Sequence, residues 1–377
     1  MVDAWRLFPS VRAALRNSIL PGDGHLCRYI DQIGLAMVKT NQVALSKRKA
    51  CTGGTMAFHK LSERTSKTAG RTTLKPAYQT DLGRMFNANI ETAMSSEPIA
   101  SLKGQVNLVF TSPPFPLVKK KKYGNLDGEE YLAWITRIAT QLTELLAPDG
   151  SLVVEIGNAW ERGRPVMSTL PIETLLAVSK VPGLHLCQQF ICHNPARIPG
   201  PAQWVTIERI RVKDSFTQVW WFSKTDKPKA DNRAVLAPYT DSMKSLLRRR
   251  KYNAGARPSG HRVSKDSFFT DNGGAIPPSV LEYSNTAWSA DYRTWCADNG
   301  VPPHPASMSP GLAEFFVKFL TDENDIVLDP FGGSNTTGSV AESLGRRWIS
   351  VELDPNYVFG SRGRFDALRS PLRQRRR

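Results

Sequence analysis

A serine, two prolines and an aromatic residue follow one another at Ser112-Pro113-Pro114-Phe115, directly behind the apolar run 106–110. Because proline lacks an N–H and fixes φ, the prolines end the strand predicted by that run and hold a stiff, open loop. The loop combines a hydroxyl, backbone carbonyls and an aromatic face, which could hold a flat ring by its exocyclic amine. Taken alone, these residues favour an ordinary turn, so the rest of the chain must decide between the two interpretations.

A second group of polar residues lies near the C-terminus, where two apolar runs each end in an acid, Asp329 and Glu352. The turn 330–338 between them contains adjacent glycines and leads into a helix predicted to end at Gly345. The second acid follows the first by 23 residues. This spacing is typical of a nucleoside-binding β-α-β unit, in which the second carboxylate accepts from the ribose hydroxyls.

This turn does not fit either of two common phosphate-binding patterns. A dinucleotide fingerprint from Gly332 needs glycines where Ser334 and Thr337 stand, and a P-loop from Gly333 needs lysine in place of Ser339. Two carboxylates without a basic residue in the turn favour a cationic ligand. The pattern therefore predicts S-adenosylmethionine, with its sulfonium and amine, and leaves an ordinary strand–turn–helix connection as the alternative.

A parallel sheet is needed to bring the two groups together, and the hydrophobic pattern predicts one. A helix is expected to begin near Asp127 and Glu130, which resemble a capping box, and to end at 148–150. The strand 151–156 follows and carries Glu155 near its end. Strand, helix and strand at this spacing form a β-α-β unit. Further elements are predicted as strands at 184–192, 217–223, 325–329 and 347–352 and as a helix from Pro310.

Basic residues are concentrated at the two ends of the chain. Residues 1–75 hold 13 Lys and Arg against 4 Asp and Glu, and residues 360–377 hold 7 against 1. The ends therefore supply 15 of the 16 net positive charges, and the middle is almost neutral. Such ends indicate either a polyanionic partner, usually nucleic acid, or solubilising tails.

Composition argues against several classes of protein. The sequence has no run of about 18 apolar residues, which a membrane span requires. Its N-terminal 20 residues intersperse arginines among apolar positions, unlike a secretory signal. The five cysteines are scattered without a CxxC spacing, which argues against a zinc site or a disulfide framework and favours a reducing cytoplasm. We therefore expect a cytoplasmic protein without a metal ion.

The sequences TSPPF (111–115) and DPFGGSNTTG (329–338) resemble the catalytic and cofactor motifs of the amino-group DNA methyltransferases. Their order is that of the permuted (beta) class, with the catalytic motif first. Between and around them, YGN (123–125), IRVKD…VWWFSK (210–224), DNGGAIPPSVL (271–281) and HPA (304–306) extend the likeness to the PvuII-type cytosine-N4 members. The resemblance implies an α/β fold, Rossmann-like, with a mostly parallel seven-stranded sheet and a smaller target-recognition region.

The resemblance also implies a division of the chain and a set of cofactor-binding residues. The expected segments are a poorly ordered basic extension (1–75), a catalytic half (76–223), the target-recognition region (224–300), a cofactor-binding half (301–360) and a basic tail (361–377). S-adenosylmethionine would bind to Asp81, His304, Asp329, Phe331, Gly332, Gly333, Ser334, Asn335, Thr336, Thr337 and Glu352. For Asp81 a surface loop acid, and for His304 a buried histidine bonded to backbone, remain as alternatives.

The catalytic residues expected from the resemblance are Ser112, Pro113, Pro114, Phe115 and Glu155. The target amine would donate to the Ser112 hydroxyl and the Pro113 carbonyl, which exposes the nitrogen lone pair for in-line attack on the methyl group. Phe115 would stack on the base after it has flipped out of the duplex. Glu155 would stabilise the positive charge that develops on the amine and relay its proton through Ser112.

The expected substrate is the N4 amine of cytosine in double-stranded DNA, with the N6 amine of adenine as the alternative. Methylation at C5 is disfavoured because no cysteine follows a proline in this sequence. A DNA-binding protein without catalysis is the rival of another class. The resemblance further implies a restriction endonuclease as genetic partner, a bacterial cytoplasmic location at the nucleoid, and a monomer, with a dimer as the alternative.

Overall fold

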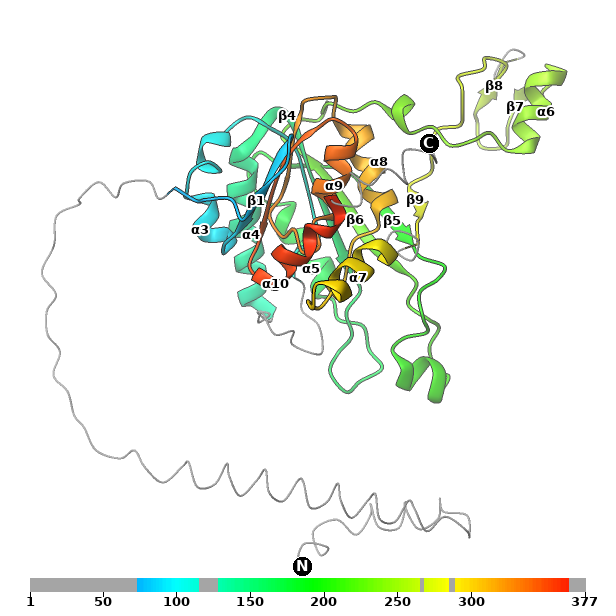
Figure 1. Cartoon of the computed structure of the whole chain (residues 1–377). Helices are drawn as coiled ribbons and strands as arrows, with labels where there is room; N and C mark the ends of the chain where they lie inside the picture. The colour runs from blue at the N-terminus through cyan, green and yellow to red at the C-terminus, as the bar shows by residue number, and fades with distance from the viewer. Residues whose placement is uncertain (1–72, 115–127, 265–267, 285–288, 366–377) are drawn as a thin grey trace, which may run out of the picture. The chain divides into compact units, whose positions relative to one another are not determined.

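The computed structural model describes residues 73–114, 128–264, 268–284 and 289–365 (Figure 1). All of these residues lie within one compact unit, 69–377. The predictions for Phe115, for the YGN stretch and for most of the two basic ends concern residues outside these ranges. Among the helices of the described ranges, none has the length and hydropathy of a membrane span.

A nine-stranded sheet forms the centre of this unit, in the order β1-β2-β11-β10-β3-β4-β6-β5-β9. Strands β1 and β6 run antiparallel to the other seven. The strands are β1 Tyr78–Gln79, β2 Gly83–Asn87, β3 Val106–Thr111, β4 Leu146–Gly157, β5 His185–His193, β6 Phe216–Ser223, β9 Val280–Glu282, β10 Ile326–Asp329 and β11 Arg347–Glu352.

The α/β class and the mostly parallel sheet predicted from the sequence are confirmed. The sheet is wider than the seven strands expected, because short strands β1 and β9 extend its two edges. These strands have two and three residues, too few for a periodic pattern to be visible in the sequence.

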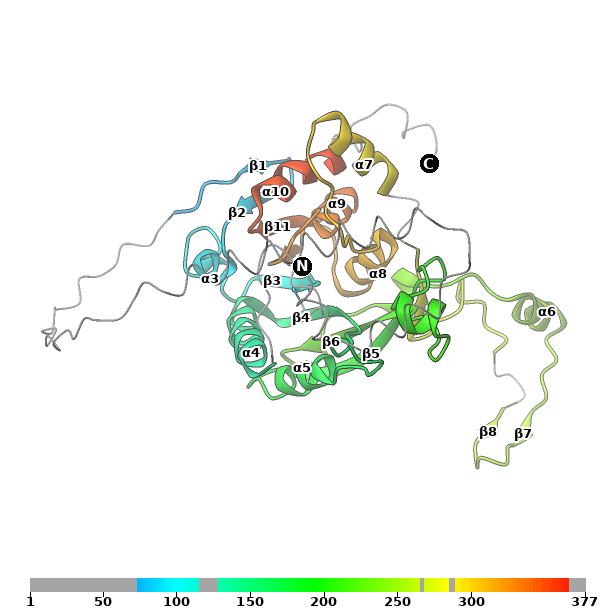
Figure 2. The same cartoon turned by 90° about the horizontal axis from the view of Figure 1, so that it is seen from below.

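Helices cover both faces of the sheet (Figure 2). One face packs against α3, α4 and α5, and the other against α8, α9 and α10. Since most strands are buried on both faces, they read as nearly continuous apolar runs. The helices are α3 Ile90–Met94, α4 Gly128–Leu145, α5 Leu170–Val178, α6 Asp241–Arg249, α7 Ser289–Asp298, α8 Pro310–Leu320, α9 Thr336–Ser343 and α10 Pro355–Ser361.

The carboxyl ends of the parallel strands meet along one side of the sheet, which we call the carboxyl edge. In the register of the strands, Thr111 of β3 pairs with Val154 of β4, and Asp329 of β10 pairs with Ser350 of β11. Glu352 ends β11 at the same edge. The predicted β-α-β units are therefore confirmed, and they bring the two polar groups of the sequence together.

The region 224–300 is loop-rich, as expected, but two of its elements join the main structure. It contains a short helical turn at Asn232–Val235, helix α6, and a separate hairpin of β7 Gly255–Ala256 and β8 Arg262–Val263. Its strand β9 extends the main sheet beside β5, and its helix α7 packs on α10 through Trp295 and Phe359, whose ring centroids are 5.4 Å apart. These pairings depend on distant parts of the chain, so the local sequence does not reveal them.

Compact structure also continues past residue 361, where the basic tail was predicted to begin. Ser361, Arg364 and Phe365 are buried. The Phe365 ring stacks on Trp348 of β11 with a centroid distance of 5.0 Å. The predicted start of the basic tail at residue 361 is thus too early. Arg362 and Arg364 made this folded segment resemble a charged tail in the sequence.

Candidate active site at the carboxyl edge

The turn after β10 folds back onto the end of β11 through its glycines. The Gly333 N–H donates to Glu352 Oε2 at 2.8 Å. Gly333 has a φ of +52°, and a Cβ at this position would lie 3.2 Å from the His304 ring. Both the backbone angle and the limited space favour glycine at this position. The glycine therefore allows the turn to approach Glu352 closely.

The carboxylate of Glu352 is held in place by two backbone groups. In addition to the bond from Gly333, Oε1 accepts from the Asp354 N–H at 2.8 Å. Burial raises the pKa of Glu352, although these two hydrogen bonds lower it. A carboxylate has about four acceptor positions, so two donors from the chain leave room for the two hydroxyls of a ribose.

Asp329 is buried at the end of β10 and joins the two polar groups. Its Oδ1 accepts from the Thr111 hydroxyl at 2.8 Å and from the Phe331 N–H at 3.1 Å. Burial raises the pKa of Asp329 to about 6 in spite of these bonds. Within the described ranges no lysine or arginine pairs with it. A buried carboxylate of this kind suits the cationic part of a ligand.

Two polar residues of the turn support its shape. The Asn335 side chain is fully buried; Oδ1 accepts from the Ser350 hydroxyl at 2.7 Å and the Gly338 N–H at 3.2 Å, and Nδ2 donates to the Tyr78 hydroxyl at 3.0 Å. The Thr337 hydroxyl donates to a backbone carbonyl of β3 at 3.5 Å. Helix α9 begins within the predicted turn, so these side chains point into the core.

An arginine that the sequence did not single out also holds the turn. Arg364 donates from Nε to the Ser334 carbonyl at 2.7 Å and from Nη2 to the Ser334 hydroxyl at 2.9 Å. Its guanidinium lies 4.6 Å from the Tyr292 ring centre, and burial lowers its pKa to about 10. The Ser334 hydroxyl also contacts the hydroxyls of Ser307 and Thr336. No local pattern distinguishes Arg364 from the arginines around it.

Ser112 directly follows the last residue of β3, and Glu155 lies on the neighbouring strand β4. Phe110 and Val153 pair with each other and lie in the cluster on the α8 side of the sheet. Two residues further along, Ser112 and Glu155 fall on the same face, on strands about 4.8 Å apart. The predicted pairing of the two strands is confirmed, and the adjacency of Ser112 and Glu155 stays a prediction.

The carboxyl group of Glu155 is partly buried and contacts β6. Its Oε1 accepts from the Thr217 hydroxyl at 2.9 Å. Burial raises the pKa of Glu155, while the bond from Thr217 and the positive charge of Arg197 lower it. A partly buried carboxyl group with a raised pKa, on the strand beside the one that Ser112 follows, is a candidate proton acceptor.

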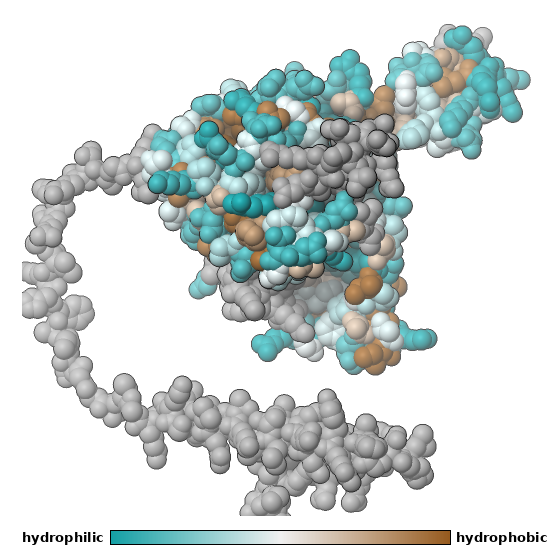
Figure 3. Space-filling model, viewed as in Figure 1, coloured by the Kyte–Doolittle hydropathy of each residue, from teal (hydrophilic) through white to brown (hydrophobic). Residues whose placement is uncertain are grey.

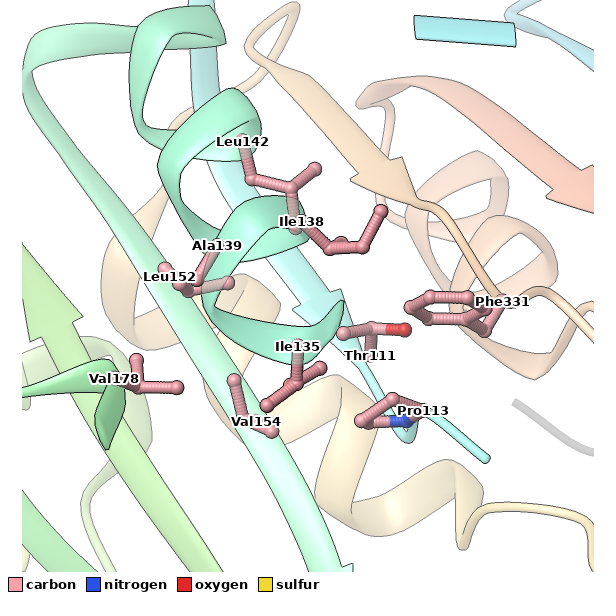
Figure 4. Close-up of a pocket in the computed structure, with 10 residues that line it drawn as sticks. All are labelled: Thr111, Pro113, Ile135, Ile138, Ala139, Leu142, Leu152, Val154, Val178 and Phe331. Atoms are coloured by element: carbon pink, nitrogen blue, oxygen red, sulfur yellow. The ribbon is translucent and has the colours of Figure 1, made fainter. Parts of the chain in front are cut away.

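An apolar pocket lies beneath the loop that follows β3 (Figure 4). Pro113 and Phe331 approach each other at one end of it, and the Phe331 ring also contacts Trp134 at a centroid distance of 5.6 Å. The pocket is lined mainly by apolar side chains of α4 and β4, with Pro113 and Phe331 at the carboxyl edge. Its lining residues are Thr111, Pro113, Ile135, Ile138, Ala139, Leu142, Leu152, Val154, Val178 and Phe331.

The structure does not bring Asp81 to this site. In the pairing of β2 with β11, Gly83 lies beside Trp348 and Asn87 beside Glu352. Asp81 precedes Gly83, so it is exposed at the opposite end of β2, more than about 13 Å of extended chain from Glu352. We therefore do not assign it to the cofactor.

Asn87 takes the place at the carboxyl edge that had been expected for Asp81. Its Nδ2 donates to the carbonyls of Glu352 and Leu353, each at 3.0 Å. The signal that could have revealed it is its position at the end of an apolar strand, which in a parallel sheet points to the ligand edge.

His304 does lie at the site, against the glycine turn. The His304 ring packs edge-on against Tyr357 at a centroid distance of 4.6 Å, and the backbone N–H of His304 donates to the Tyr292 hydroxyl at 2.9 Å. In the loop after Ser112, Pro113 is buried and Pro114 is half-buried.

Across the described ranges, no group of three or more His, Cys, Asp and Glu residues could hold a metal ion.

Comparison with known proteins gives three consistent results. A family model described as DNA methylase matches residues 106–361. The type II methyltransferase M.PvuII of Proteus hauseri is 44% identical over 293 residues, which cover 77% of this chain and 86% of that protein. The type II methyltransferase M.BamHI of Bacillus amyloliquefaciens is 25% identical over 299 residues, covering 74% of this chain and 56% of that protein.

Among solved structures, the chain is similar to a protein described as PvuII DNA methyltransferase (cytosine-N4-specific). The two superpose with a TM-score of 0.63 at 38% sequence identity, over 78% of this chain and 90% of that one. The family model, over residues 106–361, includes the strands from β3 to β11 along the chain and both polar groups of the carboxyl edge.

Proposed function

The chain belongs to the DNA methylase family that acts on exocyclic amines, and we propose that it transfers a methyl group from S-adenosylmethionine to the N4 amine of cytosine in double-stranded DNA. The observation that carries this proposal is the 2.8 Å hydrogen bond from Thr111 to Asp329. It joins the loop of Ser112 to the glycine turn, so that a methyl donor and an acceptor amine can meet. The cytosine-N4-specific structure that aligns with this chain supports the choice of base.

The glycine turn fits the proposed cofactor. Glu352 is positioned to accept from the ribose hydroxyls, and the backbone of Gly332 and Gly333 allows close approach. Asp329 offers a buried negative charge to the cationic end of the ligand. When bound, S-adenosylmethionine supplies an electrophilic methyl group. Asn335 and Thr337 act by holding the turn rather than by direct contact.

Ser112 and the Pro113 carbonyl would then orient the amine of the target base. Both groups accept hydrogen bonds from the amine, and the nitrogen lone pair is directed at the methyl carbon. The N–C bond would form as the C–S bond of the donor breaks, which would leave a positive charge on the nitrogen. Glu155 stabilises that charge and takes the released proton by way of Ser112. Phe115, outside the described residues, is proposed to stack on the flipped base.

The proposed biological role is protection of host DNA in a restriction–modification system. The relatives M.PvuII and M.BamHI are both type II methyltransferases. A restriction endonuclease of the same specificity would be the genetic partner of this protein, without a physical complex. We retain the predicted monomer as part of this proposal.

The test is methylation of unmethylated plasmid DNA with labelled S-adenosylmethionine, followed by mass spectrometry of the nucleosides. N4-methylcytosine is the expected product, and mapping the label identifies the target sequence. N6-methyladenine would keep the fold and the cofactor but overturn the assignment of the base. Absence of both labelled product and cofactor binding would overturn the proposed enzyme activity.

A further inference from the structure

Two loops extend from the carboxyl edge next to the proposed catalytic residues. Residues 158–168 follow β4, which carries Glu155, and residues 194–215 join β5 to β6. Because β4 and β5 both run antiparallel to β6, the two loops leave the sheet on the same side. Figure 1 shows both projecting beyond the strand ends. We call them the paired loops.

The paired loops are held together by specific contacts. Trp160 and Trp204 pack with a ring-centroid distance of 5.7 Å. Arg211 donates from Nη2 to the Pro165 carbonyl at 2.8 Å. At their base, the Asn158 side chain donates to Asp214 Oδ1 at 2.8 Å. The two loops therefore form one ordered projection.

This projection ends in apolar side chains that have little contact with the rest of the protein. Ile198, Ile207 and Val212 are 82%, 68% and 87% exposed, and Ile210 is exposed as well. Figure 3 shows hydrophobic residues gathered at the end of the projection, with hydrophilic residues around them. Apolar groups exposed together on an ordered element usually mark a binding surface.

Basic side chains surround this apolar tip. Arg162, Arg164 and Arg209 are exposed. Arg211 and Lys213 donate to backbone carbonyls of the loops, and Arg197 donates to the Phe216 carbonyl at the start of β6. Of the three acids in the paired loops, Asp214 bonds to Asn158 and Arg197, and Glu208 accepts from Gln203. Glu161 is the third. The exposed charge is mainly positive, which complements a polyanion and disfavours a second copy of the same basic surface.

We propose that the paired loops form a wedge that enters duplex DNA beside the target cytosine; this inference rests on the proposed function. Apolar side chains that insert between base steps unstack them and lower the cost of extruding a base. Arginines beside them would hold the phosphates. The loops leave the same edge as Ser112 and Glu155. Region 224–300 leaves the sheet at the end of β6, on the opposite edge, and returns to the carboxyl edge only at the end of β9.

The first test separates base extrusion from chemistry. The wedge variant Ile207→Ser/Val212→Ser is compared with the control Ile172→Ser/Leu176→Ser, which changes two side chains on α5 that are 52% and 56% exposed. Each is assayed on a duplex that contains the mapped target and on the same duplex with an abasic position opposite the target cytosine. The wedge variant should lose about tenfold in kcat/KM on the matched duplex and recover most of this loss on the abasic duplex, where extrusion is cheaper.

The second test addresses the basic rim. Arg162→Gln/Arg164→Gln/Arg209→Gln should weaken duplex affinity and reduce the slope of log K against log [salt] by about 1 to 3. The matched control Lys103→Gln/Lys180→Gln removes exposed charges before β3 and β5, at the opposite edge, and should leave the slope unchanged.

The inference is overturned if the wedge variant matches the control on both duplexes. It is also overturned if the loss is the same on the matched and abasic duplexes, which would indicate damage to the chemical step. Sedimentation of the wild type and the wedge variant gives a third check, because dissociation of a dimer in the variant would assign the tip to contact between copies. Failure of the wild type to methylate any DNA would instead contradict the proposed function.

Discussion

At the scale of single residues, Ser112 and Asp329 are proposed to have different roles, in catalysis and in cofactor binding. They lie close to each other, because a hydrogen bond joins Thr111 to Asp329. Thr111, which bonds to Asp329, is the immediate neighbour of Ser112. Ser112 is half-buried at the edge, whereas Asp329 is buried. We therefore expect variants of Ser112 to affect catalysis alone and variants of Asp329 to affect cofactor binding and stability together.

Replacing Ser112 with alanine should abolish methyl transfer while cofactor binding persists. The variant removes the hydroxyl that accepts from the target amine, so kcat should fall about 100-fold or more. Calorimetry with S-adenosylmethionine should give a Kd close to that of the wild type. Ser95→Ala, at an exposed serine that bonds to helix carbonyls, is the control. Unchanged turnover in Ser112→Ala would contradict the role assigned to this hydroxyl.

The buried charge of Asp329 should make the protein without cofactor less stable as pH rises. The pKa of Asp329 is about 6 in the folded protein, compared with 3.8 for an unperturbed aspartate. The folded state therefore binds a proton more tightly than the unfolded state. The stabilisation is complete below about pH 4 and is lost as pH rises through about 6. The upper limit of this loss is about 3 kcal/mol.

Asp329→Asn keeps an oxygen for Thr111 and Phe331 but removes the charge. Thermal unfolding without cofactor should show the variant to be more stable than the wild type at pH 8, by an amount that shrinks below pH 6. The stabilisation that S-adenosylmethionine gives the wild type should be lost. Asp149→Asn, at an exposed position, should show neither effect. An equally cofactor-stabilised Asp329→Asn protein would argue against a cofactor contact.

At the scale of elements, the start of α9 depends on Asn335. This residue has a φ of 55° and caps the helix, and its buried amide joins Gly338, Ser350 and Tyr78. Asn335→Ala should cost about 2–4 kcal/mol, because it leaves buried groups without partners and because alanine tolerates positive φ less well than asparagine, whose side chain forms local hydrogen bonds there. Denaturant unfolding measures this cost. Asn299→Ala, at an exposed asparagine, should cost much less; similar values for both would contradict the buried network.

The contact between β4 and β6 should set the pH at which the proposed base works. The Thr217 hydroxyl donates to Glu155 and lowers its pKa. Thr217→Val removes this bond at nearly constant volume, so the pKa of Glu155 should rise. The acid limb of the kcat profile should then move to higher pH, because a proton acceptor must be ionised. Thr140→Val on the exposed face of α4 is the control, and a profile that does not move would exclude Glu155 as the base.

At the scale of the whole molecule, the charge distribution separates DNA affinity from chemistry. The extension 1–75 carries a net charge of +9 by its 13 basic and 4 acidic residues, while the proposed catalytic and cofactor-binding residues all lie later in the sequence, from Ser112 to Glu352. Removing residues 1–72 should therefore lower affinity for any duplex and flatten its salt dependence. Turnover at saturating DNA should stay within about twofold of the full chain. Equal affinity at all salt concentrations would make the extension a solubilising segment.

Much of the fold and part of the site could be read from local sequence. The runs that became β3, β4, β10 and β11 are apolar because they are buried on both faces, and prolines and glycines mark their ends. Ser112, Asp329 and Glu352 were identified because each stands directly after such a run. Each apolar run and the residue that marks its end lie within a few positions of one another in the sequence, so a local pattern is enough to identify them.

Tertiary structure alone decided which residues meet. The pairing of β2 with β11 places Asn87, and not Asp81, beside Glu352. The bonds of Arg364 to Ser334 and of Asn335 to Tyr78 join residues 30 and 257 positions apart. The paired loops acquire a common direction only through β6. Register and side-chain contacts between distant segments depend on the free energy of the whole packed core, which no local pattern contains.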